Sequence, residues 1–305
     1  MKIEEIAELW RQDKKKFIKR SSFSTYSHRI KSHVEPYFGD FSEIEESLVQ
    51  KYVLEKVDEG LSRRTIRDVL MVLKMILQYG KKKGLIEFDD SSWEIKYPTV
   101  TNKKKSIKTY TSDQVKKISD YCYENGTFRN LGILITLRTG MRIGEICGLI
   151  WKNVDIERGV FVIERTINRI YDHDKGRTEI IIDSPKTVCS NREIPISPDL
   201  RVILAHIKPQ MKDHYYVIAG SDHVVEPRTF RVHYNKMLKV VDIPILKFHG
   251  LRHTFATQCI AANIDVKVVS SILGHANTNI TYNLYVHPDA VQQKSAIDTI
   301  FKHLQ

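Results

Sequence analysis

The sequence predicts a mainly α-helical protein with a small antiparallel β-sheet, an α+β chain organised as two domains. Apolar residues recur at helical spacing through residues 1–98. Strand-like runs follow at residues 160–164, 178–183 and 193–196, and helical patterns return from residue 198 onward. A length of 305 residues is long for one domain and sufficient for two.

Residues 1–98 are expected to form a compact bundle of about four helices. The clearest helical pattern begins at Ser62, a capping residue type, and ends at Gly80. One apolar stripe runs between them, formed by Ile66, Val69, Leu70, Leu73, Ile76 and Leu77. Residues 99–108 are polar and basic without a periodic apolar face, so they are predicted to be a linker to a mixed domain over residues 109–305.

Positive charge is concentrated in the second part of the chain. The formal net charge is +11 at pH 7; residues 1–98 carry 19 Lys+Arg against 17 Asp+Glu, whereas residues 99–305 carry 29 against 20. Lys and Arg near phosphates release condensed counterions, so a nucleic acid is the expected partner and a solvated basic surface is the alternative. No apolar run suggests a membrane span, and four scattered cysteines indicate reduced thiols in a cytoplasmic protein.

Two segments combine arginines with apolar helical scaffolding. In residues 139–149 (TGMRIGEICGL), Arg142 follows a glycine turn, and Glu145 lies three residues on, so both point the same way. A surface ion pair is the alternative, but the rest of this helix is apolar, and a buried Arg requires a reason. In residues 248–256 (FHGLRHTFA), His249 and Arg252 share one helix face.

Two further segments supply a lysine, a histidine and two tyrosines. Lys186 lies in SPKTVCSNREIP between two strand-like runs, where an exposed hairpin lysine is the default alternative. In LGHANTNITYNLYVH, His275 follows Gly274 at a turn, and a short helix presents Tyr282 and Tyr285. Either tyrosine could instead be a packed aromatic residue with a hydrogen-bonded hydroxyl.

Together these residues are the set that metal-free phosphoryl transfer requires. Guanidinium groups match the negative charge on the equatorial oxygens of the transition state. A histidine can take the proton of a hydroxyl nucleophile, and a lysine can protonate the leaving alkoxide. A zinc site at His249 and His253 is the rival interpretation, but position 250 is Gly where a metalloprotease has Glu. No metal and no other cofactor is therefore expected.

The four segments resemble the tyrosine recombinases, also called phage-type integrases. The boxes TGMRIGEICGLIW, SPKTVCSNREIPI, HGLRHTFAT and LGHANTNITYNLYVH occur in the order and at the spacing of that family. The resemblance implies a tyrosine recombinase catalytic domain over residues 109–305. On helix pattern and position alone, residues 1–98 look like the family's SAM-like core-binding domain, without the additional arm-binding domain of many members.

The resemblance implies how the site would hold its substrate. Arg142 and Arg252 would clamp the scissile phosphate, and His275 would form a hydrogen bond with a phosphate oxygen. Glu145 would support Arg142. Metal and ATP would both be unnecessary, because the energy of the broken bond is kept in an ester to the protein.

It also implies a nucleophile and its proton partners. Tyr285 would attack and form a 3′-phosphotyrosine, His249 would accept its proton, and Lys186 would protonate the 5′-oxygen leaving group. A 5′-hydroxyl of the partner strand would then attack the ester. Tyr285 is preferred over Tyr282 because the family's tyrosine is usually followed two residues later by a histidine, here His287.

The implied partner is double-stranded DNA carrying recombination or attachment sites. The protein would act as a homo-oligomer, with a tetrameric synapse built from two dimers at the bacterial nucleoid, and an accessory DNA-bending or excision factor is a further candidate partner. Lysines near the linker would track phosphates, namely Lys103, Lys104, Lys105 and Lys108. A terminal apolar helix face would pack on a neighbouring protomer, as in relatives, or on its own domain; it comprises Ile297, Ile300, Phe301 and Leu304.

The predicted function is site-specific DNA recombination, with integration and excision of a mobile element or prophage. Xer-like resolution, DNA inversion and type IB topoisomerase-like relaxation are alternatives with the same chemistry. A DNA-binding regulator with an inactive site is a further alternative, but every expected catalytic position is filled.

Overall fold

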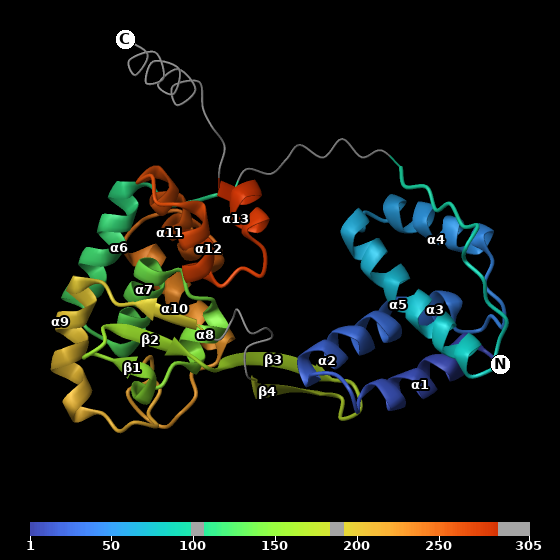
Figure 1. Cartoon of the computed structure of the whole chain (residues 1–305), viewed down its shortest axis with the longest axis horizontal. Helices are drawn as coiled ribbons and strands as arrows, with labels where there is room; N and C mark the ends of the chain where they lie inside the picture. Colours follow the sequence, from blue (N-terminus) through green and yellow to red (C-terminus); the bar gives the residue numbers. More distant parts are fainter. Residues whose placement is uncertain (99–106, 184–191, 286–305) are drawn as a thin grey trace, which may run out of the picture. The chain divides into compact units, whose positions relative to one another are not determined.

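The computed structural model describes residues 1–98, 107–183 and 192–285, which form two compact units (Figure 1). The first unit comprises Met1–Lys105 together with Ile170–Glu179, and the second comprises Ser106–Arg169 with Ile180–Gln305. Each unit has its own apolar core. The predicted positions of Lys186, of the first three linker lysines and of the terminal helix lie outside the described residues.

The first unit is a helical bundle, as the apolar periodicity predicts. Its helices are α1 (Ile3–Lys14), α2 (Arg20–Arg29), a π-helical turn (Ile30–Val34) leading into α3 (Glu35–Phe38), α4 (Glu46–Asp58) and α5 (Arg63–Lys82). Ser62 caps α5, since its hydroxyl accepts the backbone N–H of Thr65 at 3.1 Å. The stripe predicted along α5 packs into the core of this unit, with Ile66, Val69 and Ile76 fully buried.

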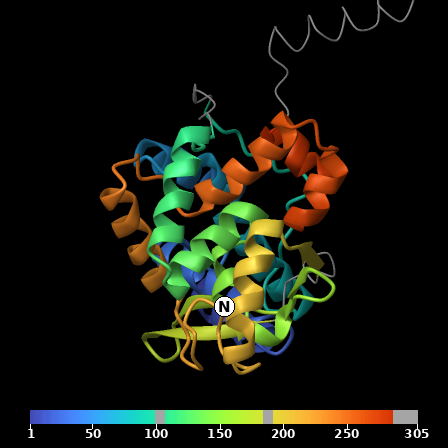
Figure 2. The same cartoon turned by 90° about the vertical axis from the view of Figure 1, so that its left-hand side faces the viewer.

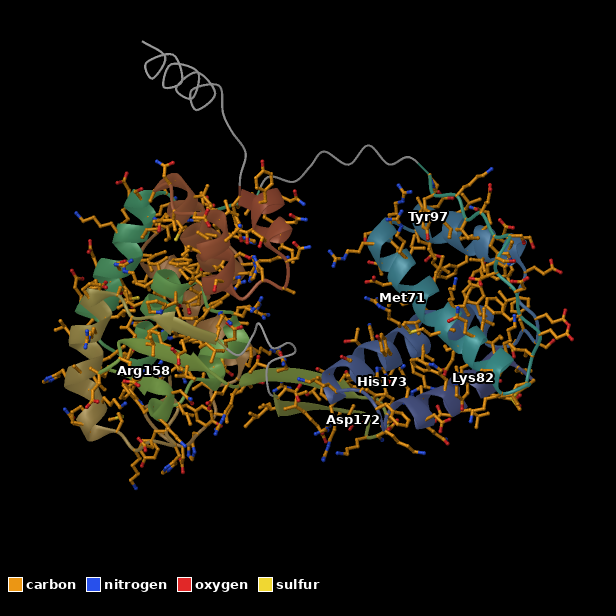
Figure 3. All side chains as sticks on the ribbon, viewed as in Figure 1. Met71, Lys82, Tyr97, Arg158, Asp172 and His173 are labelled. Atoms are coloured by element: carbon orange, nitrogen blue, oxygen red, sulfur yellow. The ribbon has the colours of Figure 1, made fainter. Side chains whose placement is uncertain are left out.

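A hairpin turn completes the first unit. It joins β3 (Thr166–Asp172) to β4 (Arg177–Asp183), which form a two-stranded sheet of their own. Arg11 on α1 and Lys15, which directly follows α1, both bind Asp174 in the turn, each at 2.6 Å. Figure 3 labels the neighbouring Asp172 and His173. The turn is therefore held to the bundle largely by ion pairs.

The strand at 178–183 is confirmed, but its pairing differs from the single sheet expected. β4 pairs with β3, a strand that the sequence pattern does not predict. The pattern misses β3 because Ile167 is its only buried residue. The strand therefore lacks the clear alternation of apolar and polar residues that is typical of a half-buried strand.

The second unit surrounds a central helix. Helices α6 (Ser112–Glu124), α7 (Phe128–Thr139) and α8 (Ile143–Gly148) are followed by a three-stranded antiparallel sheet in the order β1 (Val154–Asp155), β2 (Val160–Ile163), β5 (Arg192–Pro195). Phe161 of β2 lies opposite Ile194 of β5. α7 lies in the middle of this unit (Figure 2). Every residue from Leu131 to Leu137 on it is buried, as expected of a helix that is apolar all round.

The C-terminal helices of this unit carry two of the predicted boxes. They are α9 (Pro198–Ile207), α10 (Pro227–Val240), α11 (His249–Ala261), α12 (Val266–Leu273) and α13 (Thr278–Tyr285), and α11, α12 and α13 pack on one another (Figure 1). Within the described part of the chain, no helix combines the length and apolar character needed to cross a bilayer.

Candidate active site

Two glycines in the left-handed conformation let the predicted boxes converge. Gly140 ends α7 with φ +66°, and a Cβ there would come within 2.8 Å of Phe255 and closer still to Leu273. Gly274 ends α12 with φ +65°, and a Cβ there would lie 2.9 Å from the guanidinium of Arg192. Both positions require glycine for conformation and for space. As a result, the α7–α8 turn, α11, α12 and the start of β5 meet at one point.

Three arginines bind three consecutive carbonyls at the end of α12. The pairs are Arg192 Nε with Ile272 O at 2.7 Å, Arg252 Nη2 with Leu273 O at 2.8 Å, and Arg142 Nη2 with Gly274 O at 2.9 Å. The last carbonyls of a helix have no partner within the helix and carry its partial negative charge. They therefore assemble guanidinium groups that would otherwise repel one another.

Arg252 is the most buried of the three, with 1% of its surface exposed. It also donates to Gly140 O at 2.9 Å, while its Nε has no hydrogen-bond partner in residues 1–98, 107–183 and 192–285. Burial, and then the charge of Arg142, lowers the pKa of Arg252 to about 9, so the guanidinium remains protonated at neutral pH. Among the described residues no carboxylate forms an ion pair with it.

Glu145 is the carboxylate that organises the other two arginines. It is buried, accepts from Arg142 Nη1 at 2.8 Å, and receives both Nη atoms of Arg192 at 3.0 Å. Burial acts to raise the pKa of Glu145, but the hydrogen bonds and charges of Arg192 and Arg142 outweigh it and lower the pKa to about 2. The carboxylate is therefore ionised at neutral pH.

Arg192 is not among the residues that the sequence patterns single out. A signal exists, because alternate residues of a strand share a face and Arg192 lies two positions before the buried Ile194. An arginine on the buried face of a short strand needs a partner, and here that partner is Glu145.

Two predicted histidines lie around this cluster. His249 begins α11 with an exposed edge, and His275 follows Gly274 with its Nδ1 2.7 Å from the hydroxyl of Thr281. The pKa of each histidine is lowered to about 4. The largest cause is desolvation by the surrounding protein, and nearby positive charges add to it. Both rings are consequently neutral near pH 7 and can accept hydrogen bonds.

The two candidate nucleophiles differ in their surroundings. Tyr285 is 8% exposed, packs against Ala256, Val269 and Leu273, and has its hydroxyl 2.6 Å from Nδ1 of His253. Tyr282 is 55% exposed on the same helix. Burial raises the pKa of Tyr285 and the charge of Arg252 lowers it, so this phenol lies within electrostatic reach of the arginine cluster.

The cluster carries a net positive charge suited to a phosphodiester. Arg142, Arg192 and Arg252 oppose Glu145 alone in this group of four side chains. An excess of positive charge stabilises a phosphate group as charge builds up on its oxygens in the transition state. Within the described residues, no group of three or more His, Cys, Asp or Glu side chains is arranged to hold a metal ion.

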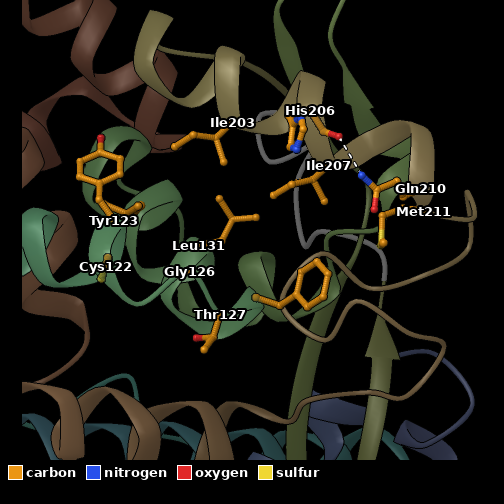
Figure 4. Close-up of a pocket in the computed structure, with 12 residues that line it drawn as sticks. Cys122, Tyr123, Gly126, Thr127, Leu131, Ile203, His206, Ile207, Gln210 and Met211 are labelled. Atoms are coloured by element: carbon orange, nitrogen blue, oxygen red, sulfur yellow. Dashed lines mark hydrogen bonds between the residues drawn. The ribbon is translucent and has the colours of Figure 1, made fainter.

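A separate apolar pocket of about 400 Å³ lies between the α6–α7 turn and α9 (Figure 4). Leu131, Ile203, Ile207 and Met211 line it together with Cys122 and Tyr123. None of the predicted catalytic residues lines this pocket, and neither lysine nor arginine is among the residues that line it.

Comparisons with known proteins identify relatives of both units. Residues 108–292 match the model of the phage integrase family, and residues 2–57 match that of the phage integrase N-terminal SAM-like domain. A XerC-like tyrosine recombinase of Caldanaerobacter subterraneus is 26% identical, over 92% of this chain and 78% of the relative. The transposase of transposon Tn916 from Enterococcus faecalis is also 26% identical, over 80% of this chain and 63% of the relative.

Solved structures share the fold. The Tn1549 transposon integrase in complex with a circular intermediate DNA superposes with a TM-score of 0.76 at 18% identity, covering 98% of this chain and 99% of that one. A lambda integrase dimer bound to a core site gives a TM-score of 0.64 at 16% identity, covering 94% and 96%. The SAM-like and catalytic architecture expected from the sequence is thereby confirmed.

Proposed function

This chain belongs to the phage integrase family, and from that premise we propose that it recombines DNA at specific sites through a covalent bond to Tyr285. The observation that carries the proposal is the convergence of three predicted boxes, and of Arg192 from the fourth, at the end of α12. Arg142, Arg252, His249 and His275 lie there beside a buried tyrosine. These are the groups that phosphoryl transfer without a metal requires.

The arginines would bind the scissile phosphate of the DNA. Arg252 has an unused Nε donor, and the side chain of Arg142 is 37% exposed, so both retain capacity for phosphate oxygens. Neutral His275 would hydrogen-bond a phosphate oxygen, and Glu145 would keep Arg142 in place. Lys186 would protonate the 5′-oxygen as the phosphorus–oxygen bond breaks.

The two units would divide DNA binding between them. Residues 1–98 would form the core-binding domain and residues 109–305 the catalytic domain, with linker lysines along the phosphates. Lys108 supports this assignment, because it is exposed directly after Ile107, which packs against the cluster that contains Tyr285. Lys103, Lys104 and Lys105 precede it in the chain.

The recombining species would be a tetramer formed from two DNA-bound dimers, and an accessory DNA-bending or excision factor would be a further partner. The fold shared with a lambda integrase tetramer bound to a Holliday junction supports the tetramer.

The apolar face at residues 297–304 would hold such a tetramer together by packing on a neighbouring protomer. Deleting residues 294–305 should then weaken synapsis more than binding to a single site, and unchanged synapsis would contradict this arrangement.

Movement of a mobile element is the biological role we favour. Relatives include the transposases of Tn916 and of Tn1545 from Streptococcus pneumoniae, each 26% identical to this chain. The XerC-like relative supports Xer-like resolution as the alternative. Inverted repeats beside the gene would favour inversion instead.

The test of the chemistry is Tyr285→Phe with Tyr282→Phe as its matched control. On a nicked substrate, the wild-type protein and Tyr282→Phe should accumulate a denaturation-resistant protein–DNA adduct, because the cleaved end diffuses away. Tyr285→Phe should form none while still binding DNA in a mobility-shift assay. An adduct with Tyr285→Phe would refute the assignment, and its loss in Tyr282→Phe would move the nucleophile to that residue.

A further inference from the structure

His253 is a residue of α11 to which the family resemblance gives no role. It follows Arg252 directly and lies one helical turn after His249. Its Nδ1 is 2.6 Å from the hydroxyl oxygen of Tyr285, and the two ring centroids are 5.6 Å apart. This hydrogen bond joins α11 to α13 at the atom that would attack the phosphorus.

We propose, building on the function above, that His253 is a catalytic residue that exchanges the proton of the Tyr285 hydroxyl during cleavage and rejoining. The family resemblance gives this task to His249. The distance between Nδ1 of His253 and the reacting oxygen of Tyr285 is that of a short hydrogen bond.

The direction of the hydrogen bond agrees with such a role. Burial lowers the pKa of His253, and the charge of Arg252 adds to this effect, so the ring is neutral near pH 7. Burial raises the pKa of Tyr285, so the phenol keeps its proton. The phenol therefore donates and Nδ1 accepts, which places the ring proton of His253 on Nε2.

The surroundings of His249 favour a different task. Its ring is nearly perpendicular to that of His253, with centroids 4.6 Å apart, and its edge is exposed where α11 begins. The titratable and charged side chains around His253, among the described residues, are His249 and Arg252 on its own helix and Tyr285 from α13. This arrangement leaves His249 free to contact the bound phosphate while His253 contacts the nucleophile.

The proposed step balances in both directions. In cleavage, Tyr285 Oη bonds to phosphorus, its proton moves to Nδ1 of His253, and the phosphorus–O5′ bond breaks as the 5′-oxygen takes a proton from Lys186. In rejoining, a 5′-hydroxyl gives its proton to Lys186 and attacks phosphorus. The phosphorus–Oη bond then breaks, and His253 returns its proton to Tyr285.

The primary experiment compares His253→Gln with His249→Gln in the full-length protein. Glutamine can accept the hydrogen bond but cannot carry the proton. The single-turnover rate of adduct formation on a nicked substrate should fall about 100-fold or more in His253→Gln near pH 7. The difference in this rate between His253→Gln and wild type should become smaller as the pH rises, because solvent hydroxide can replace the base. Mobility shifts and thermal unfolding serve as controls for binding and folding.

Two chemical rescues separate the base from the leaving-group acid. Replacing Tyr285 by difluorotyrosine lowers the pKa of the nucleophile and should restore the rate of His253→Gln. A substrate with sulfur in place of the bridging 5′-oxygen needs no acid, so it should rescue Lys186→Ala and leave His253→Gln slow. The proposal is overturned if His253→Gln stays within about threefold of wild type, a far smaller loss than removal of a proton carrier causes. The proposal is also overturned if difluorotyrosine at position 285 restores the rate of His249→Gln and not that of His253→Gln.

A spectroscopic measurement decides the matter if His253→Gln fails to fold. In ¹⁵N-histidine-labelled wild-type protein, His253 should carry its proton on Nε2, and Tyr285→Phe should shift the Nδ1 resonance. An unchanged Nδ1 resonance would overturn the proposal. A wild-type protein that forms no adduct at all would instead refute the proposed function.

Discussion

Arg11 in the first unit and Arg252 in the second are both almost completely buried, yet their surroundings are opposite. The side chain of Arg11 is 5% exposed and binds Glu8 and Asp174, each at 2.6 Å, and Ser27 at 3.2 Å. Within the part of the chain that the structure describes, Arg252, at 1% exposure, binds only backbone carbonyls and keeps one N–H without a partner.

The difference distinguishes an arginine that stabilises structure from one that is available for a substrate. Carboxylates neutralise Arg11, so its burial ties α1 to the hairpin turn. Backbone carbonyls satisfy the hydrogen bonds of Arg252 without cancelling its charge, so its burial leaves an unbalanced cation. Under the proposed function, the phosphate of the bound DNA would supply the missing negative charge.

Arg252→Met should give the largest functional effect, because it keeps the side-chain volume and removes the charge. Adduct formation on a nicked substrate should fall by about 1,000-fold or more, as expected for loss of an arginine that stabilises phosphoryl transfer. The free energy of unfolding should change by about 1 kcal/mol or less, since the lost carbonyl bonds are offset by relief of an unpaired buried charge. Single-turnover kinetics and urea denaturation measure the two quantities.

Glu145→Gln should affect activity and stability together. Because folding lowers the pKa of Glu145 from 4.5 to about 2, the carboxylate stabilises the fold above pH 4.5, and this contribution is lost as the pH falls toward 2. The variant should unfold about 3 kcal/mol more easily at pH 7 and show a weaker dependence on pH between 4.5 and 2. Adduct formation should fall about 10- to 100-fold as Arg142 loses its support.

Urea denaturation at a series of pH values tests the second prediction. If wild type and Glu145→Gln lose stability in parallel between pH 4.5 and 2, Glu145 is not the carboxylate responsible.

Arg11→Met should give the smallest effect on chemistry and forms the matched control for Arg252→Met. The free energy of unfolding should fall by about 1–3 kcal/mol, because Glu8 and Asp174 lose a charged hydrogen-bond partner but remain partly exposed. The rate of adduct formation on a nicked substrate should stay within about threefold of wild type, as expected of a substitution that affects stability alone. If Arg11→Met lost more cleavage activity than Arg252→Met, the distinction between a structural Arg11 and a substrate-binding Arg252 would be wrong.

Much of the fold and site can be predicted because the relevant signals are local. The stripe on α5, the cap at Ser62 and the glycine turns before Arg142 and His275 are all patterns within a few residues. The family boxes add residue roles because each joins a polar group to a fixed local scaffold. These signals suffice for the helical class, for the strands at 160–164 and 193–196, and for most of the candidate catalytic residues.

Only the tertiary structure decided which of these groups touch. Tyr285 meets His253 across 32 positions of the chain, Arg192 meets Ile272 across 80, and Arg11 meets Asp174 across 163. β3 likewise became a strand through its partner β4 and not through its own pattern. Periodicity and capping depend on neighbours along the backbone, whereas the partner of a buried charge or hydroxyl depends on how whole helices pack, which no short stretch of sequence encodes.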